Sequence, residues 1–506
     1  MATNPILVVF VHGWSVTHTD TYGGLPRRLS AEAAAAGLDI RTEDIYLGKY
    51  ISFRDEVRVT DIARAFDSAV ERQLRPSLDN GRRFVCITHS TGGPVIRLWW
   101  RDYYKRRAGS GACPMSHLVM LAPANHGSAL AQLGKGRLSR LKFAFQGVEP
   151  GQGVLDWLEL GSDKAWELNS DWIETPANAI GAQGLFPFVL TGQSIDRAFY
   201  DNLNSYTGEL GSDGVVRSAS ANLNARYIQL TQQAPVGTES DGGQFRAPAL
   251  AVSRYVEAPQ TAFRILAGKS HSGGAMGIMR SVHAGGADPG SMPTIQAILD
   301  AIAVSTKNQY QALCRRWAEE TRQVQDDELV EKEDRILRDR YFIHDRCSMV
   351  IFRLRDDRDF ALADFDLLLT AGAQNDPNHL PEGFLQDRQR NRLNPECITY
   401  YFNYDLMKGT GEVVHEGKVI RGARTGTDSL GVKLAPRPGS GFVHYLPCGI
   451  ETSAELLDKA LQPNATTLID IRLRRLVHAN VFDVEALKTA ENSSFKHTRP
   501  AGELAT

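Results

Sequence analysis

The sequence has little of what marks several common classes of protein. Its 57 Lys and Arg residues nearly balance 59 Asp and Glu residues, so the formal net charge of −2 indicates no nucleic-acid partner. No apolar run reaches the length of a membrane-spanning helix, and the segment Met1 to Pro5 carries no basic residue of the kind that opens a secretion signal. We therefore expect the protein to be cytoplasmic as synthesised, with export without a cleaved signal as the alternative.

Cysteine is also sparse. The six cysteines show neither C-x-x-C spacing nor a dense disulfide framework, so we predict reduced thiols at Cys86, Cys113, Cys314, Cys347, Cys397 and Cys448. The acidic stretch from Arg355 to Asp359 is a weak candidate for calcium, which prefers clustered oxygen ligands. Its interleaved arginines favour a salt-bridged surface loop instead. We predict neither a metal nor a cofactor.

What the sequence does contain is a serine between an apolar run and a pair of glycines. The run at 84–87 continues through Thr88 and His89 to Ser90, and Thr91 and two glycines follow. A strand, a sharp turn and a helix in this order hold a serine hydroxyl clear of its own backbone and beside N–H donors. Thr88 stands where the G-x-S-x-G pattern has its first glycine. We predict that Ser90 is a nucleophile, the alternative being a buried serine in an ordinary turn.

A second segment predicts donors for an oxyanion. The continuous apolar run at 6–11 is typical of a central parallel strand buried on both faces, and His12, Gly13 and Trp14 follow it. A sharp turn at Gly13 would let the backbone N–H of Trp14 face the backbone N–H of Thr91 across the serine. We interpret His12 as a turn-fixing residue and not as a base.

An acid and a base follow the serine in the chain. Asp213 lies in a glycine-flanked loop at 211–216, and His271 lies in a loop that follows the apolar strand at 263–267. In this order His271 would take the Ser90 proton and return it to the leaving group, while Asp213 would orient the imidazole. Loop position and flanking glycines favour this pair over the alternatives, which are His283 and His126 for the base and Asp196, Asp201 and Asp241 for the acid.

These motifs together resemble the α/β-hydrolases of the lipase superfamily. The segment 121–128 is similar to the strand and loop that follow the nucleophile helix in bacterial and lecithin-cholesterol-acyltransferase-like lipases. The resemblance covers roughly residues 1–300. It implies a serine carboxylester hydrolase, a lipase or phospholipase, that forms an acyl-enzyme on Ser90 and acts on a lipid ester or phospholipid. The same framework also carries thioesterases and acyltransferases, so the substrate stays open.

Length and composition predict more than one domain. A chain of 506 residues with 42% hydrophobic content exceeds the usual size of a single core. We predict an α/β-hydrolase domain over 1–304 with a helical cap insertion at about 128–184, a helical linker over 305–344, a β-rich domain with a β-sandwich fold over 345–490, and a flexible tail over 491–506. The cap is either a moving lid or a permanently packed subdomain.

The second half leaves two further possibilities open. Without a signal peptide and with a β-rich appendage, the chain is also similar to antibacterial phospholipase effectors that bacteria inject into rivals. That similarity implies an export machine or an immunity protein as a partner, and contact with a membrane surface. The alternative to an enzyme is a binding or scaffold protein that kept the hydrolase fold and acts through residues 345–490, which the intact serine, acid and histidine order disfavours.

Overall fold

The structure is a computed structural model of the chain. It describes residues 5–12, 20–49, 56–78, 81–106, 112–133, 151–195, 209–234, 248–286, 288–333 and 339–477.

The first half is built on a six-stranded sheet, here called the hydrolase sheet. Its strand order is β2-β1-β3-β4-β5-β8, and every pairing is parallel. The strands are β1 (Ile6–His12), β2 (Ile40–Tyr46), β3 (Phe84–His89), β4 (Met115–Leu121), β5 (Phe186–Thr191) and β8 (Ala262–Ile265). The apolar runs that predicted strands form β1, β3 and β8, because such runs can be buried on both faces of a parallel sheet.

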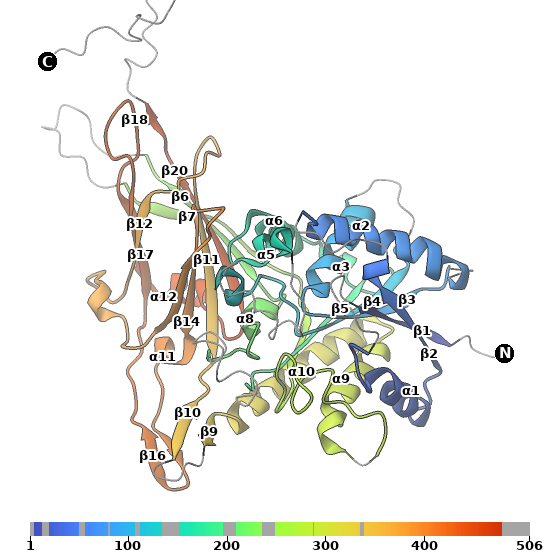
Figure 1. The fold of residues 1–506 in the computed structure, drawn as a ribbon. Helices are drawn as coiled ribbons and strands as arrows, with labels where there is room; N and C mark the ends of the chain where they lie inside the picture. The colour runs from blue at the N-terminus through green and yellow to red at the C-terminus, as the bar shows by residue number, and fades with distance from the viewer. Residues whose placement is uncertain are drawn as a thin grey trace, which may run out of the picture.

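Helices cover both faces of this sheet, which is the α/β-hydrolase fold predicted from the sequence (Figure 1). In the view of Figure 1, α2 and α3 lie above the sheet and α1 and α9 lie below it. These helices are α1 (Leu25–Ala35), α2 (Val59–Ala69), α3 (Gly92–Trp100) and α9 (Met292–Ile302).

The predicted linker contains a long helix, α10 (Lys307–Asp327), that packs on the hydrolase domain. Tyr310 donates its hydroxyl to the Pro187 carbonyl at 2.6 Å, and the buried Trp317 ring lies 5.9 Å from the ring of Phe188. Because these aromatic residues are separated by seven positions, they lie on one face of the helix. This helix therefore covers the edge strand β8, and Gln325 near its end is hydrogen-bonded to Asn464 beside the mixed sheet.

The second half contains a larger mixed sheet, here called the mixed sheet, with the order β13-β14-β11-β20-β6-β7. Its strands are β6 (Arg226–Gln232), β7 (Leu250–Glu257), β11 (Cys347–Asp356), β13 (Leu385–Arg390), β14 (Cys397–Asn403) and β20 (Thr466–Leu473). Two of them, β6 and β7, come from the range predicted for the hydrolase domain, and β6 pairs with β20 in parallel. The strands therefore do not follow the predicted division at residue 304.

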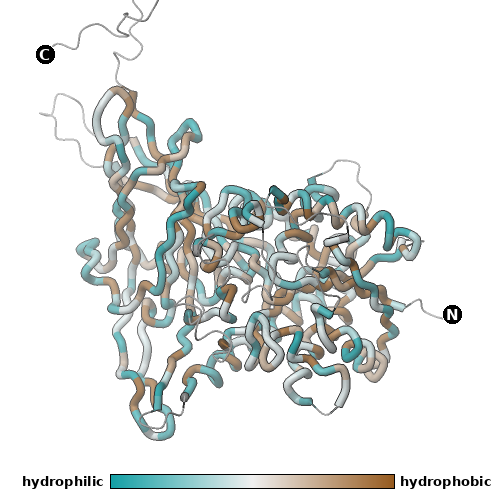
Figure 2. The backbone as a smooth tube through the Cα atoms, viewed as in Figure 1, coloured by the Kyte–Doolittle hydropathy of each residue, from teal (hydrophilic) through white to brown (hydrophobic). Residues whose placement is uncertain are grey.

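A three-stranded sheet covers one face of the mixed sheet, which confirms a separate β-rich region of two packed sheets. It consists of β12 (Phe365–Thr370), β17 (Leu430–Pro436) and β19 (Cys448–Ser453). Alternate residues of β11 show both faces of the mixed sheet: Val350 and Phe352 pack toward the three-stranded sheet, whereas Met349 and Ile351 pack toward the hydrolase domain. Figure 2 shows apolar residues along the strands of both halves and hydrophilic residues at many turns.

Further short elements lie beside these sheets. They include three two-stranded pairs, β9 (Val330–Glu333) with β10 (Arg340–Ile343), β15 (Val413–His415) with β16 (Lys418–Arg421), and β18 (Val443–His444) with β21 (Leu476–Val477), and the helices α8 (Ser218–Ala221), α11 (Tyr404–Lys408) and α12 (Ala454–Ala460). Among the described residues, no helix combines the length and the apolar character needed to cross a membrane. The predicted tail at 491–506 lies outside the described residues.

The described part of the predicted cap lies between the two halves. It contains α5 (Gln152–Leu158) and α6 (Asp163–Ile173). Residue Trp172 of α6 belongs to the hydrolase core, whereas Trp166 packs on the mixed sheet with the Arg353 guanidinium 4.2 Å over its ring. This packing on both sides favours the packed subdomain over the moving lid. Residues 134–150 of the predicted cap lie outside the described residues.

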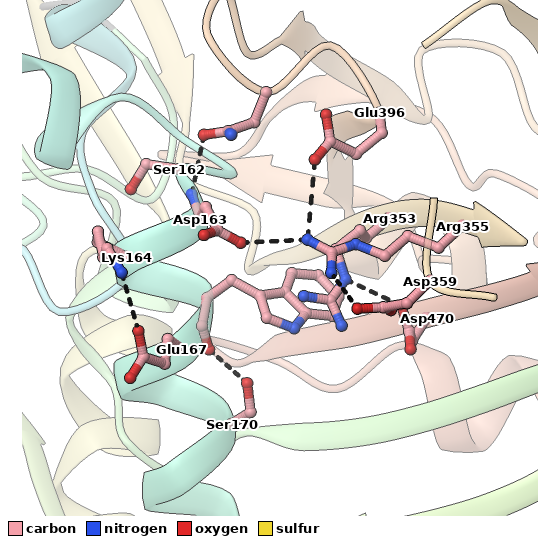
Figure 3. Close-up of polar contacts among 12 residues, drawn as sticks. Ser162, Asp163, Lys164, Glu167, Ser170, Arg353, Arg355, Asp359, Glu396 and Asp470 are labelled. Carbon is pink, nitrogen blue, oxygen red and sulfur yellow. Dashed lines mark hydrogen bonds and ion pairs between the residues drawn. The ribbon is translucent and has the colours of Figure 1, made fainter. Parts of the chain in front are cut away.

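Polar contacts strengthen the same contact between cap and mixed sheet (Figure 3). The Asp163 carboxylate at the start of α6 lies 3.3 Å from the guanidinium of Arg355 on β11, and Glu396 lies 3.9 Å from it. Arg355 also pairs with Asp359 at 3.1 Å, as predicted for a salt-bridged loop.

Candidate active site

The predicted nucleophile lies at the turn between β3 and α3. Ser90 has a φ of +52°, a left-handed backbone conformation that costs energy for a residue with a side chain. Backbone hydrogen bonds hold the turn. The Ser90 N–H donates to the Leu121 carbonyl at 3.0 Å, and the Ser90 carbonyl accepts from the N–H groups of Gly93 at 3.2 Å and Ala124 at 3.3 Å. This strained, fixed backbone is the geometry that presents a serine hydroxyl at the end of a parallel sheet.

The structure explains why threonine is tolerated two residues before the serine. A Cβ atom on Gly92 would lie 1.8 Å from the Oγ1 atom of Thr88. The Thr88 side chain is fully buried and occupies the space that a side chain at 92 would need. Of the two glycines in the G-x-S-x-G pattern, this turn therefore needs only the second, Gly92, because the Thr88 side chain fills the space beside it.

Three predicted residues from separate loops meet at this turn. The Ser90 Oγ atom lies 3.1 Å from Nε2 of His271, and Nδ1 of His271 lies 3.0 Å from Oδ2 of Asp213. The exposed fractions are 8% for Ser90, 1% for His271 and 0% for Asp213. An imidazole that donates its Nδ1–H to the carboxylate can accept the serine proton at Nε2, so the arrangement can activate the hydroxyl without a conformational change.

Backbone groups hold the carboxylate in this position. Oδ1 of Asp213 accepts hydrogen bonds from the N–H groups of Val215 at 3.0 Å and Val216 at 2.8 Å. The His271 N–H donates to the Asp213 carbonyl at 2.9 Å, so the two loops are joined through backbone as well as side chains. The second carboxylate oxygen is thereby left directed at the imidazole.

His89 is a neighbour of the site that sequence reasoning missed. Its Nε2–H donates to the His271 carbonyl at 3.1 Å, and the two rings lie 4.7 Å apart. Burial, together with repulsion from His271, lowers the pKa of His89 well below its usual range. A neutral His89 therefore supports the His271 loop. Its position next to the serine was the available signal.

The two alternative bases, His126 and His283, do not lie at the site. His126 is buried and hydrogen-bonded to the Ser220 carbonyl at 3.1 Å, and burial, with repulsion from Arg97, lowers its pKa to about 3. The His283 side chain is largely exposed. Among the described residues only His271 is hydrogen-bonded to the Ser90 hydroxyl. The alternative acids Asp196, Asp201 and Asp241 lie outside the described residues.

The predicted oxyanion donors are described in part. Thr91 directly follows the nucleophile and forms the first residue before α3, where backbone N–H groups point out of the helix. Trp14 lies outside the described residues. His12 at the end of β1 pairs with Asp44 at 2.9 Å and stacks on Tyr46 with ring centres 4.3 Å apart, and the turn that it was predicted to fix lies outside the described residues.

Neither a metal site nor a disulfide is found in the part of the chain that the structure describes. No group of three or more His, Cys, Asp or Glu residues there is placed to hold a metal ion. All six cysteines are buried as free thiols.

Comparison with known proteins identifies the family. A structure of phospholipase PlaB from Legionella pneumophila is 42% identical, with a TM-score of 0.82 over 99% of this chain and 100% of that chain. A structure of the same phospholipase in complex with thio-NAD is 41% identical, with a TM-score of 0.81 over 98% of this chain and 100% of that chain. No family model and no curated protein matches the chain. The chain therefore belongs to the family of phospholipase PlaB and is a lipid ester hydrolase of the α/β-hydrolase fold.

Proposed function

We propose that Ser90, His271 and Asp213 form the catalytic triad of this hydrolase and that it cleaves a carboxylester of a glycerophospholipid. The observation that carries the proposal is the continuous chain of contacts, 3.1 Å from Ser90 to His271 and 3.0 Å from His271 to Asp213. Both distances lie within the range in which a proton can pass between heavy atoms.

The reaction follows from these contacts. The Ser90 Oγ atom attacks the ester carbonyl carbon while Nε2 of His271 takes its proton, and Asp213 stabilises the imidazolium that forms. The backbone N–H of Thr91, with that of Trp14 as the predicted second donor, stabilises the oxyanion. His271 then protonates the departing alcohol oxygen, which leaves an acyl group on Ser90. Water, deprotonated by the same imidazole, releases the fatty acid and restores the serine.

The choice of phospholipid rests on the relatives. Both matched structures are of one phospholipase, and the alignment covers almost the whole of each chain, including the β-rich region. Contact with a membrane surface follows from such a substrate. An export machine or an immunity protein as partner, and a role as an antibacterial effector, remain predictions from the sequence.

Release of fatty acid from phosphatidylglycerol and phosphatidylcholine vesicles tests the proposal. We expect Ser90→Ala and His271→Ala to lose a factor of about 10⁴ or more in turnover, because the members of a triad act as a unit. His283→Ala is the matched control, since this histidine is exposed, and it should retain the wild-type rate. A Ser90→Ala variant that hydrolyses phospholipid at the wild-type rate would overturn the proposal.

A further inference from the structure

The loop that carries Asp213 rests on the mixed sheet. This segment, residues 209–218 and here called the acid loop, is closed by a backbone bridge between Ser212 and Arg217 and by the Ser218 N–H, which donates to the Gly211 carbonyl at 2.8 Å. Asp213 lies at the turn of this closed loop and faces His271. The residues that hold the two ends of the loop therefore determine where the carboxylate lies.

The Arg217 side chain runs from the acid loop into the mixed sheet. It is only 2% exposed, and its guanidinium pairs with Glu209 at the start of the loop and with Asp387 on β13. The same guanidinium lies 4.1 Å over the ring of Tyr401 on β14. One side chain thus ties the acid loop to two strands that lie more than 150 residues further along the chain.

Tyr401 holds the other end of the loop through its hydroxyl. This hydroxyl donates to the Leu210 carbonyl at 2.8 Å and lies 3.3 Å from the Gly211 carbonyl. Gly211 has a φ of +64°, and a Cβ atom there would lie 2.7 Å from the tyrosine oxygen. The loop backbone therefore packs directly on the hydroxyl, with no room for a side chain between them.

The electrostatics of this contact favour one fixed geometry. Burial alone would lower the pKa of Arg217, but Glu209 and Asp387 more than offset it, so the pKa lies above the ordinary value. Burial raises the pKa of Glu209 in spite of its arginine partner. Buried ion pairs of this kind add little net stability, because desolvation cancels most of the attraction, but a misplaced partner leaves a charge uncompensated. Their clearest effect is to hold Arg217, Glu209 and Asp387, and with them the acid loop, in one arrangement.

We propose that Arg217 and Tyr401 are positioning residues for the triad, through which the mixed sheet holds Asp213 in line with His271. The inference rests on the proposed function of Asp213. It assigns the β-rich region a direct part in turnover, because two of its strands supply the groups that fix the acid loop. Neither Arg217 nor Tyr401 touches the Ser90 hydroxyl, and both act through Asp213.

Two conservative variants in the mixed sheet test the inference without altering the acid loop itself. Tyr401→Phe removes one hydroxyl and Asp387→Asn removes one charge, and both keep the shape of the side chain. Because displacement of a catalytic group by about 1 Å can cost a factor of about 100, we expect each variant to lower kcat by about 10-fold or more at unchanged KM. Asp387→Glu, which keeps the charge, should recover part of the loss.

Arg355→Gln is the matched control. It breaks the ion pair of Arg355 with Asp163, which also joins the mixed sheet to the hydrolase half, but at the more exposed start of α6 and not at the acid loop (Figure 3). We expect it to lower the unfolding temperature, because it removes a contact between the two halves, while leaving kcat unchanged. Equal losses of kcat in Arg355→Gln and Tyr401→Phe would mean a general loss of stability and would overturn the inference.

A double-mutant cycle shows whether the effect passes through Asp213. In an Asp213→Asn background the carboxylate no longer orients His271, so Tyr401→Phe should cause no further loss of kcat. An undiminished further loss would contradict the inference. If wild-type turnover depends on Ser90 but Tyr401→Phe and Asp387→Asn keep the wild-type kcat, the inference alone is wrong. If Ser90→Ala is as active as the wild type, the proposed function itself is wrong.

Discussion

The pairing of Thr88 with Gly92 at the serine turn makes a quantitative prediction. In Gly92→Ala the new Cβ atom would lie 1.8 Å from Thr88 Oγ1, whereas ordinary contacts begin at 3.4 Å. Alanine in a helix gains about 0.5–1 kcal/mol over glycine, but overpacking of a buried site costs about 1–3 kcal/mol. We therefore expect a net loss of about 1–2 kcal/mol in the free energy of unfolding.

Removing the Thr88 side chain should restore the free energy of unfolding that Gly92→Ala loses. Thr88→Ala alone loses buried methyl contacts, worth about 1 kcal/mol. It also deletes a buried hydroxyl that finds no hydrogen-bond partner among the described residues, so the two effects nearly cancel. The double variant Thr88→Ala/Gly92→Ala should then unfold close to the wild type, with a coupling energy of about 1–2 kcal/mol.

Urea unfolding and ester hydrolysis measure the two parts of this prediction. Because Gly92 lies two residues after Ser90, we expect Gly92→Ala to lower kcat by about 10–100-fold, and the double variant to recover most of it. A double variant no better than Gly92→Ala, or a Gly92→Ala protein with wild-type stability and activity, would refute the account of this turn.

Three further predictions concern other sites. Asp213→Asn should fold normally, because its side-chain oxygen can still accept from Val215 and Val216, but should lose about 10⁴-fold in kcat, as seen by vesicle hydrolysis. Trp166→Ala should lower the free energy of unfolding by about 3–5 kcal/mol without changing the preference for long or short acyl chains, whereas a changed preference would indicate a lid. Burial lowers the pKa of His117 to about 4 from an ordinary value near 6.5, so between these pH values only the unfolded chain binds the proton. The free energy of unfolding should therefore fall by up to roughly 3 kcal/mol as the pH drops from 6.5 to 4. In His117→Gln the free energy of unfolding, measured over the same pH range, should lack this decrease.

The hydrolase sheet and the three residues at its edge could be predicted because their signals are local. The continuous apolar runs of β1 and β3 are typical of strands buried inside a parallel sheet, and Ser90, Asp213 and His271 each lie in a loop with neighbouring glycines. In a parallel sheet the strands' carboxyl ends share one edge, so loops that are far apart in sequence meet there.

The parts of the fold that were not predicted depend on contacts between segments that lie far apart in the sequence. The alternating pattern of β6 is visible in the sequence, but nothing in it says that the strand pairs with β20, more than 200 residues later. The buried face of α10 was hidden by many charged residues on its other faces, which are typical of an exposed linker. Arg217 and Tyr401 carry no motif, because their importance comes from the contact between two halves of the chain.

Labelling with a fluorophosphonate, followed by peptide mapping, tests the central claim most directly. The account predicts that the probe forms a covalent bond to Ser90 in the wild type, that Ser90→Ala is not labelled, and that His271→Ala is labelled far more slowly. Labelling at another residue, or labelling of Ser90→Ala at the wild-type rate, would contradict it.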